Sequence, residues 1–93
     1  MDLVFVLPAP LRDLAENHGE VRLRGPASSA ADALWLLWKR YPALRDRVMT
    51  EVGEVRQHVN IFVDGESIRF AGGLSTPVRN GTEIVILPAI SGG

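Results

Sequence analysis

Two uninterrupted apolar runs, one near each end of the chain, constrain the fold more than any other feature of the sequence. Every residue of 3–7 is apolar, and so is every residue of 84–87. Both runs are rich in β-branched residues, a composition that favours strands over helices. Strands without polar alternation are typical of positions inside a sheet. We therefore expect both runs to be central strands that lie side by side and are buried on both faces.

The segment between these runs contains one clear helix pattern, over residues 27–41. Its large apolar residues recur at spacings of three and four and so share one helix face: Leu34, Leu37, Trp38 and Tyr41. Ser28 or Ser29 can cap the helix, and Asp32 stands three residues after Ser29, as in a capping box. Trp35 lies beside the apolar face, so we expect both tryptophans in the core or at its edge.

Alternation and turn signals predict the other elements. Alternating polar and apolar residues indicate half-buried strands, and Asp-Gly and Asn-Gly pairs indicate tight turns between strands. The predicted elements are an edge strand over residues 20–24, a short helix over 43–49, a strand over 58–64, a return strand over 66–70 after the Asp64-Gly65 turn, and a final strand over 82–87 after Asn80-Gly81.

The order of the elements is strand, strand, helix, strand, strand, strand. With the first and last strands adjacent, this order makes a mixed sheet with its one main helix packed across one face, an α+β architecture. It matches the β-grasp, the ubiquitin-like fold. We expect residues 1–88 to form the β-grasp domain and residues 89–93 to form a flexible C-terminal Gly-Gly tail.

The composition is that of one small globular domain and excludes several classes of function. Of the 93 residues, 46% are hydrophobic and 23% are charged, with a formal net charge of -1, so wholesale disorder is not expected. The scattered arginines leave no basic face for a nucleic acid. No apolar run approaches the length of a membrane span, and the N-terminus lacks signal-peptide features. The sequence thus predicts a cytoplasmic protein without nucleic-acid or membrane partners.

Side chains that carry chemistry are few. There is no cysteine, which excludes disulfides, thiolate metal sites and cysteine nucleophiles. His18 and His58 are far apart and have no constellation of catalytic residues beside them. We therefore expect no catalytic residue, no metal site and no bound cofactor. Any sulfur that this protein handles has to be carried elsewhere than on a side chain.

The C-terminal segment is the candidate site. Pro88 cannot donate to a strand ladder, so we expect strand pairing to stop near it. Ile90, Ser91 and Gly92 are expected to thread into a narrow channel of a partner, since the terminal residues have little side-chain bulk. The carboxylate of Gly93 is ionised at neutral pH and is a poor electrophile. A partner therefore has to activate it, and an acyl-adenylate is the usual way.

Four stretches carry a family resemblance: residues 59–70 (VNIFVDGESIRF), residues 73–77 (GLSTP), the Asn80-Gly81 turn and residues 84–93 (IVILPAISGG). Together they resemble the MoaD/ThiS family of ubiquitin-like sulfur-carrier proteins, most closely its CysO-like branch. Residues 11–14 and 40–42 also fit, so the resemblance covers essentially the whole chain. Before the last strand the family often has Asp-Gly-Asp-Glu, and residues 80–83 keep the turn with Asn-Gly-Thr-Glu.

The resemblance implies a cycle in which other enzymes act on this chain. A ubiquitin-activating-like adenylyltransferase/sulfurtransferase consumes ATP to adenylate Gly93, and a sulfur donor converts the adenylate to a thiocarboxylate. A sulfur-accepting enzyme then takes the sulfur. The CysO-like match favours cysteine biosynthesis, with a cysteine-synthase-like acceptor and a zinc-dependent isopeptidase as partners. Molybdopterin biosynthesis comes next, with the large subunit of molybdopterin synthase as acceptor.

Four residues are candidates for docking these partners. Phe62 points to the strand face opposite Val59, so it is partly exposed if the helix covers the Val59 face. Leu87 and Pro88 lie beside the tail. Arg12 follows the first strand, near the expected exit of the tail.

Two alternatives to a sulfur carrier stay open. The first is a ubiquitin-like modifier whose Gly93 is joined to target lysines after the same activation. With Lys39 as the only lysine, extended chains of such a modifier would have a single linkage. The second is a β-grasp interaction module whose terminal Gly-Gly is incidental.

Overall fold

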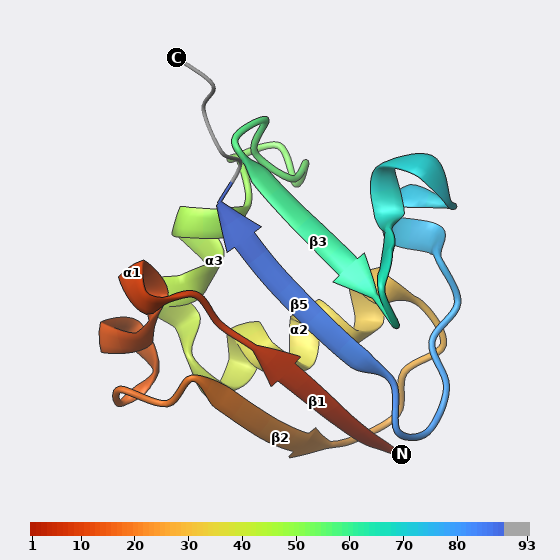
Figure 1. Cartoon of the computed structure of the whole chain (residues 1–93), viewed down its shortest axis with the longest axis horizontal. Helices are drawn as coiled ribbons and strands as arrows, with labels where there is room; N and C mark the ends of the chain where they lie inside the picture. Colours follow the sequence, from red (N-terminus) through yellow and green to blue (C-terminus); the bar gives the residue numbers. More distant parts are fainter. Residues whose placement is uncertain (89–93) are drawn as a thin grey trace.

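One five-stranded mixed sheet organises the chain (Figure 1). A computed structural model describes residues 1–88. In chain order the strands are β1 (Asp2–Val6), β2 (Glu20–Arg24), β3 (Val59–Val63), β4 (Glu66–Ser67) and β5 (Glu83–Pro88). Across the sheet they lie in the order β2-β1-β5-β3-β4.

The first and last strands lie side by side at the centre of the sheet, as the sequence predicts. β1 and β5 pair in parallel, with Val4 opposite Glu83 and Val6 opposite Val85. β2 pairs antiparallel with the other side of β1, β3 pairs antiparallel with the other side of β5, and β4 pairs antiparallel with β3. This combination confirms the predicted mixed sheet and the α+β class.

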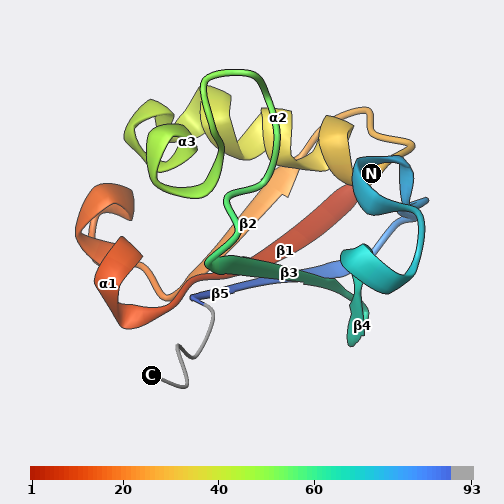
Figure 2. The ribbon, with the colours of Figure 1, turned by 90° about the horizontal axis from the view of Figure 1, so that it is seen from above.

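The helices form a second layer on one face of the sheet (Figure 2). α2 (Ala30–Arg40) and α3 (Pro42–Val48) lie across that face, and α1 (Ala9–Arg12) follows β1 at the end of the sheet. α3 confirms the predicted short helix, with Pro42 in its first turn. None of the helices in residues 1–88 is long and apolar enough to cross a membrane.

The face of the sheet away from α2 and α3 is open, which corrects the prediction that the central strands are buried on both faces. Phe5 and Ile84 point toward the helices and are fully buried. The alternate residues are only half-buried, and Leu87 is 41% exposed. The helices of residues 1–88 cover one face only. We call the other side the open face, and its apolar residues are Val4, Val6, Phe62, Val85 and Leu87.

Helix α2 begins at Ala30, three residues later than the sequence pattern predicts, and Ser29 is its N-cap. The Ser29 hydroxyl accepts a hydrogen bond from the backbone N–H of Asp32 at 3.2 Å. Ser29 has an extended backbone and forms a bridge with Pro77, which keeps the preceding residues out of the helix. The predicted cap is confirmed, and the predicted start is not.

The buried side of α2 confirms the predicted apolar face, but one tryptophan lies outside it. Leu34, Leu37 and the following Tyr41 are buried, and Trp38 is half-buried. Trp35 is 57% exposed, so the prediction of a core-edge position is wrong for this residue. Four residues further along the helix, the ammonium of Lys39 lies 4.5 Å from the centre of the Trp35 ring. This cation–π contact occupies the solvent side of the helix.

The predicted return strand over residues 66–70 is shorter than expected. Only Glu66 and Ser67 pair with β3, and a 3₁₀ turn over Ile68–Phe70 follows. The Ser67 hydroxyl accepts a hydrogen bond from the N–H of Arg69 at 3.3 Å. A serine side chain that bonds to nearby backbone competes with strand pairing, so it ends β4 early.

Candidate functional site

Strand β5 ends where the sequence predicts the functional tail to begin. Pro88 is the last strand residue, lies opposite Val59 and is exposed. Because β1 runs parallel to β5, Leu7 and Pro8 follow β1 at this same end of the sheet. The predicted flexible tail, residues 89–93, lies outside the described residues, and so do its predicted site residues: Ile90, Ser91, Gly92 and Gly93.

A groove of about 180 Å³ lies beside Pro88. Four segments far apart in the sequence form it: Pro8 with helix α1, the last turn of α3, the start of β3 and the end of β5. In Figure 1, α1 and α3 lie at the end of the sheet toward which the β5 arrow points. The exposed and half-buried residues of this groove are Pro8, Pro10, Leu11, Arg47, His58, Leu87 and Pro88.

The groove brings together two of the predicted docking residues and two residues that the sequence does not single out. Leu87 and Pro88, which the sequence predicts as docking residues, form one side of it. Arg47 belongs to the last turn of α3, and His58 directly precedes β3. No sequence motif joins these two residues to the tail, because only the packing of α3 over the end of β5 makes them neighbours.

Arg69 fixes the segment that carries His58. Its Nη2 donates hydrogen bonds to the carbonyl oxygens of Arg56, Gln57 and Val59, at 3.0, 3.2 and 2.6 Å. A charged donor shared by three carbonyls holds an irregular backbone segment in one conformation. The position of His58 at the groove is therefore set by a residue ten or more positions further along the chain.

The open face leads directly into the groove. Val6, Val85 and Phe62 lie in one row across β1, β5 and β3, and all three are half-buried. Leu87 follows on the same face of β5 and also lines the groove. Phe62 thus has the partly exposed position that the sequence predicts, and its docking role stays a prediction.

Arg12 lies at this end of the sheet but supports the turn after β1. Its Nε donates a hydrogen bond to the carbonyl of Leu7 at 3.1 Å. The guanidinium also packs against Gly19, where an added Cβ would lie only 2.9 Å from Nε. Arg12 is not among the residues that line the groove. The structure therefore gives it a structural contact, and its predicted docking role stays a prediction.

Shifted carboxyl pKa values occur away from the end of β5. The hydrogen bond and charge of Arg24 lower the pKa of Asp2. Hydrogen bonds from Ser28, chiefly from its backbone N–H, lower the pKa of Asp32. Asp2 lies at the start of β1 and Asp32 in the first turn of α2, so neither acts at the groove.

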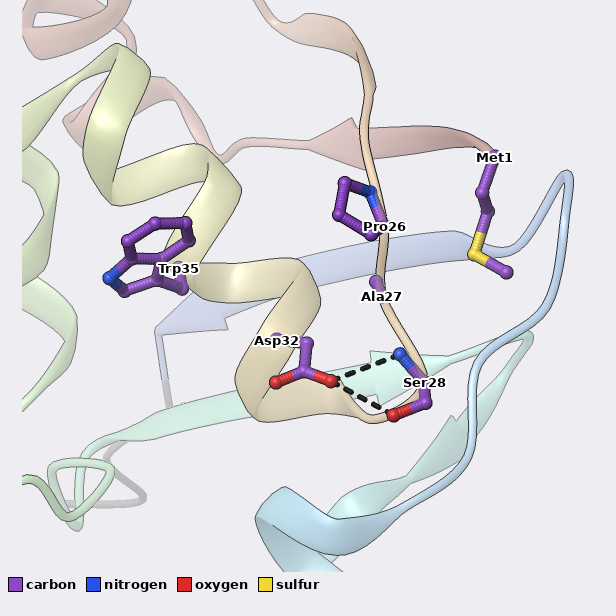
Figure 3. Close-up of a pocket in the computed structure, with 6 residues that line it drawn as sticks. All are labelled: Met1, Pro26, Ala27, Ser28, Asp32 and Trp35. Atoms are coloured by element: carbon purple, nitrogen blue, oxygen red, sulfur yellow. Dashed lines mark hydrogen bonds between the residues drawn. The ribbon is translucent and has the colours of Figure 1, made fainter.

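A wider hollow of about 560 Å³ lies at the opposite end of β1 (Figure 3). Its lining includes Met1, Pro26 and Trp35, together with Asp32 and Ser28. The Asp32 carboxylate already accepts two hydrogen bonds from Ser28, at 3.1 and 3.0 Å. Within residues 1–88 no group of three or more histidine, aspartate or glutamate side chains is placed to hold a metal ion. The end of β5 therefore remains the candidate site.

The architecture is that of the ubiquitin-like β-grasp proteins, with parallel first and last strands at the centre of a mixed sheet and a helix across one face. The sequence profile of the ThiS family matches residues 5–93. The chain belongs to the ThiS family, and the family resemblance read from its sequence is confirmed.

Two groups of relatives cover most or all of the chain. The sulfur carrier protein CysO of Mycobacterium tuberculosis is 32% identical over 95 residues, with 100% of both chains covered. Its crystal structure superposes with a TM-score of 0.85 at 28% identity, covering 95% of this chain and 99% of that one. Small archaeal modifier protein 1 of Haloferax volcanii is 36% identical over 84 residues, covering 87% of this chain and 92% of the relative.

One similar structure is a complex. A chain in the BexX/CysO complex of Amycolatopsis orientalis superposes with a TM-score of 0.85 at 25% identity, covering 98% of this chain and 99% of that one. The named relatives are thus small carrier and modifier proteins, and the CysO relative in this crystal is bound to another protein.

Proposed function

We propose that this protein is a sulfur carrier that works through the C-terminal carboxylate of Gly93, as a co-substrate of partner enzymes rather than as a catalyst. The observation that carries the proposal is the position of β5, a central strand paired on both sides that ends at the exposed Pro88. A firmly held strand gives the tail a fixed origin. The five residues 89–93 span at most about 18 Å when fully extended, so the partner's active site has to lie within that distance of Pro88.

The proposed cycle has two chemical steps at Gly93. In the first, a carboxylate oxygen attacks the α-phosphate of ATP, which gives an acyl-adenylate and releases pyrophosphate. In the second, a sulfide ion attacks the acyl carbon, AMP leaves, and a thiocarboxylate remains. The chain has no cysteine, so none of its own thiols competes for the activated acyl group. The partner binds and consumes the ATP, and a cycle that needs ATP fits the predicted cytoplasmic location.

Two kinds of partner follow from this cycle. An adenylyltransferase/sulfurtransferase related to ubiquitin-activating enzymes loads the tail, and a sulfur-accepting enzyme unloads it. The half-buried apolar residues of the open face, Phe62 and Val85 among them, provide a docking surface next to the start of the tail. The similarity to sulfur carriers named CysO supports cysteine biosynthesis, with a cysteine-synthase-like acceptor and an isopeptidase, ahead of molybdopterin biosynthesis.

A second candidate function is protein modification. It is supported by the relative from Haloferax volcanii, which is named a modifier. In that case the activated Gly93 is transferred to the amine of a target lysine and forms an isopeptide bond. Activation is the same in both functions, so the acceptor decides between them.

Intact mass spectrometry of the protein from its native host separates the two functions. A carrier gains about 16 Da when a carboxylate oxygen is replaced by sulfur. The gain is expected to disappear after hydrolysis of the thiocarboxylate, whereas alkylation of its sulfur is expected to add the mass of the alkyl group. Covalent adducts on target lysines, without the mass gain, would instead establish the modifier.

Removal of Gly92 and Gly93 tests whether the tail is needed at all. The truncated chain is expected to lose function and keep its fold, because the described elements end at Pro88. Circular dichroism and a thermal melt check the fold, and complementation of a knockout strain checks the function. If the truncated chain still complements the strain, both tail functions are wrong.

A further inference from the structure

The size and lining of the groove beside Pro88 suit a protein side chain better than a small molecule. Its volume of about 180 Å³ falls below the about 300–1,000 Å³ of ligand pockets. At about 30 Å³ for each water, it holds the equivalent of a few waters, which is enough for one leucine- or phenylalanine-sized group. Pro8, Pro10, Leu11 and Leu87 provide apolar walls for such a group.

The groove also has a positively charged residue on its rim, Arg47, and no residue in the described part of the chain pairs with it. Most arginines contact a carboxylate or donate to a backbone carbonyl: Arg22, Arg24, Arg40 and Arg45 to carboxylates, and Arg12, Arg56 and Arg69 to carbonyls. Among residues 1–88, only Arg47 and Arg79 have neither contact. Arg47 borders the groove, whereas Arg79 lies beside the Asn80-Gly81 turn, at the other end of β5. No acidic residue lines the groove.

The groove is continuous with the open face through Leu87, which belongs to both. A partner that receives the tail beyond Pro88 lies next to the groove, because Pro88 is one of its lining residues. Apolar walls and an unpaired guanidinium together match an apolar side chain with a carboxylate close by, because a carboxylate can accept two parallel hydrogen bonds from arginine.

We propose that the groove beside Pro88 receives an apolar side chain of the tail-activating enzyme, and that a carboxylate next to that side chain pairs with Arg47. This inference rests on the proposed function, since the occupant is the enzyme that adenylates Gly93. The contact places the partner at the root of the tail. His58 adds a second polar group on the same rim, held in place by the three carbonyl bonds of Arg69.

Two other occupants of the groove are less well supported. The chain's own tail is close enough, but folding it back would restrain two glycines, which lose the most conformational freedom on ordering. It would also withhold the carboxylate from activation. In a second copy of the chain, the exposed Val52 lies beside Glu51, but a valine is smaller than the leucine- or phenylalanine-sized group that fits the groove.

The test is ATP–pyrophosphate exchange by the activating enzyme of the same organism, with the full-length chain as its substrate. Arg47→Glu is expected to raise KM for the chain about tenfold, the loss typical of reversing one paired charge at an interface, while kcat stays the same. Arg79→Glu is the matched control, because it makes the same change of net charge at an equally unpaired arginine. Arg47→Lys keeps the charge but cannot make the two parallel hydrogen bonds, so its KM is expected to fall between those of the wild type and Arg47→Glu.

Each outcome has one meaning. Equal KM values for Arg47→Glu and Arg79→Glu overturn the groove proposal and leave the proposed function standing, whereas a failure of the enzyme to activate the wild-type chain overturns both. NMR of the isolated chain adds a direct check. If deletion of residues 89–93 shifts the signals of Leu11 and His58, the tail occupies the groove and the proposal is wrong. If the chain sediments as a dimer and Arg47→Glu dissociates that dimer, the occupant of the groove is a second copy of the chain.

Discussion

At the scale of single residues, several charged side chains in this protein hold backbone segments in place. Arg69 bonds to three carbonyls, Arg12 to the carbonyl of Leu7, and the Asp32 carboxylate to the N–H of Ser28. A bond from a side chain to the backbone of another segment leaves no mark in the local sequence pattern. The capping roles of Ser29 and Asp32 could be predicted, since a cap acts within four residues, although the Asp32 carboxylate bonds to Ser28 and not to Ser29.

The carboxylate of Asp32 makes stability depend on pH at acidic values. Its pKa is lowered from 3.8 in the folded chain, first by the backbone N–H of Ser28. A group whose pKa is lower in the folded state stabilises that state above its unfolded pKa, and the benefit disappears as pH falls through the folded pKa. We expect Asp32→Asn to flatten the decline of stability below about pH 4.

Urea denaturation between pH 2 and 6 measures this effect. The matched control is Asp13→Asn, because the Asp13 side chain makes no hydrogen bond or ion pair with residues 1–88. An Asp32→Asn profile that follows the wild-type profile at every pH would show that the Ser28 contact has no energetic effect.

At the scale of elements, helix α2 shows which parts of the fold follow from periodicity. The spacing of Leu34, Leu37 and Tyr41 predicts the buried face correctly, because a helix repeats every 3.6 residues whatever it packs against. The position of Trp35 could not be predicted in the same way. Trp35 lies at the margin of the apolar face. Whether a residue at that margin is buried or exposed depends on the width of the layer beneath the helix.

The two sides of α2 are expected to differ sharply in their contribution to stability. Leu37→Ala removes a fully buried side chain and should lower the free energy of unfolding by about 2–5 kcal/mol. Trp35→Ala removes a larger but exposed ring and should cost less than about 1 kcal/mol, mainly through the Lys39 contact. Chemical denaturation of the two variants gives both values. Equal losses would mean that Trp35 is buried in solution.

At the scale of the whole molecule, two layers leave one face of the sheet free for a partner. The central pairing of β1 and β5 was predictable because both runs are apolar throughout. Of the open face, only the partial exposure of Phe62 was predictable, since an apolar strand residue looks the same in a sequence whether a helix or a partner covers it. The groove was also beyond prediction, because residues 8–11, 47, 58 and 87–88 meet only in the folded chain.

A pair of aromatic substitutions tests whether the open face is the docking side. Phe62→Gln lies on the open face and should weaken adenylation by the activating enzyme, with a rise in KM of about tenfold or more. Trp35→Gln lies on the outside of the helix layer and should leave adenylation unchanged. Steady-state kinetics and a thermal melt of both variants are needed. Normal kinetics for Phe62→Gln would move the docking surface elsewhere.

The parallel pairing of β1 with β5 also sets the order in which the chain can fold. β1 is made before β5 and has it as its central neighbour, so the sheet cannot close until β5 has left the ribosome. Until then, the apolar edge of β1 has only β2 to pair with. A prematurely terminated chain that lacks β5 therefore has no sheet centre, and we expect it to be degraded before any activating enzyme meets it.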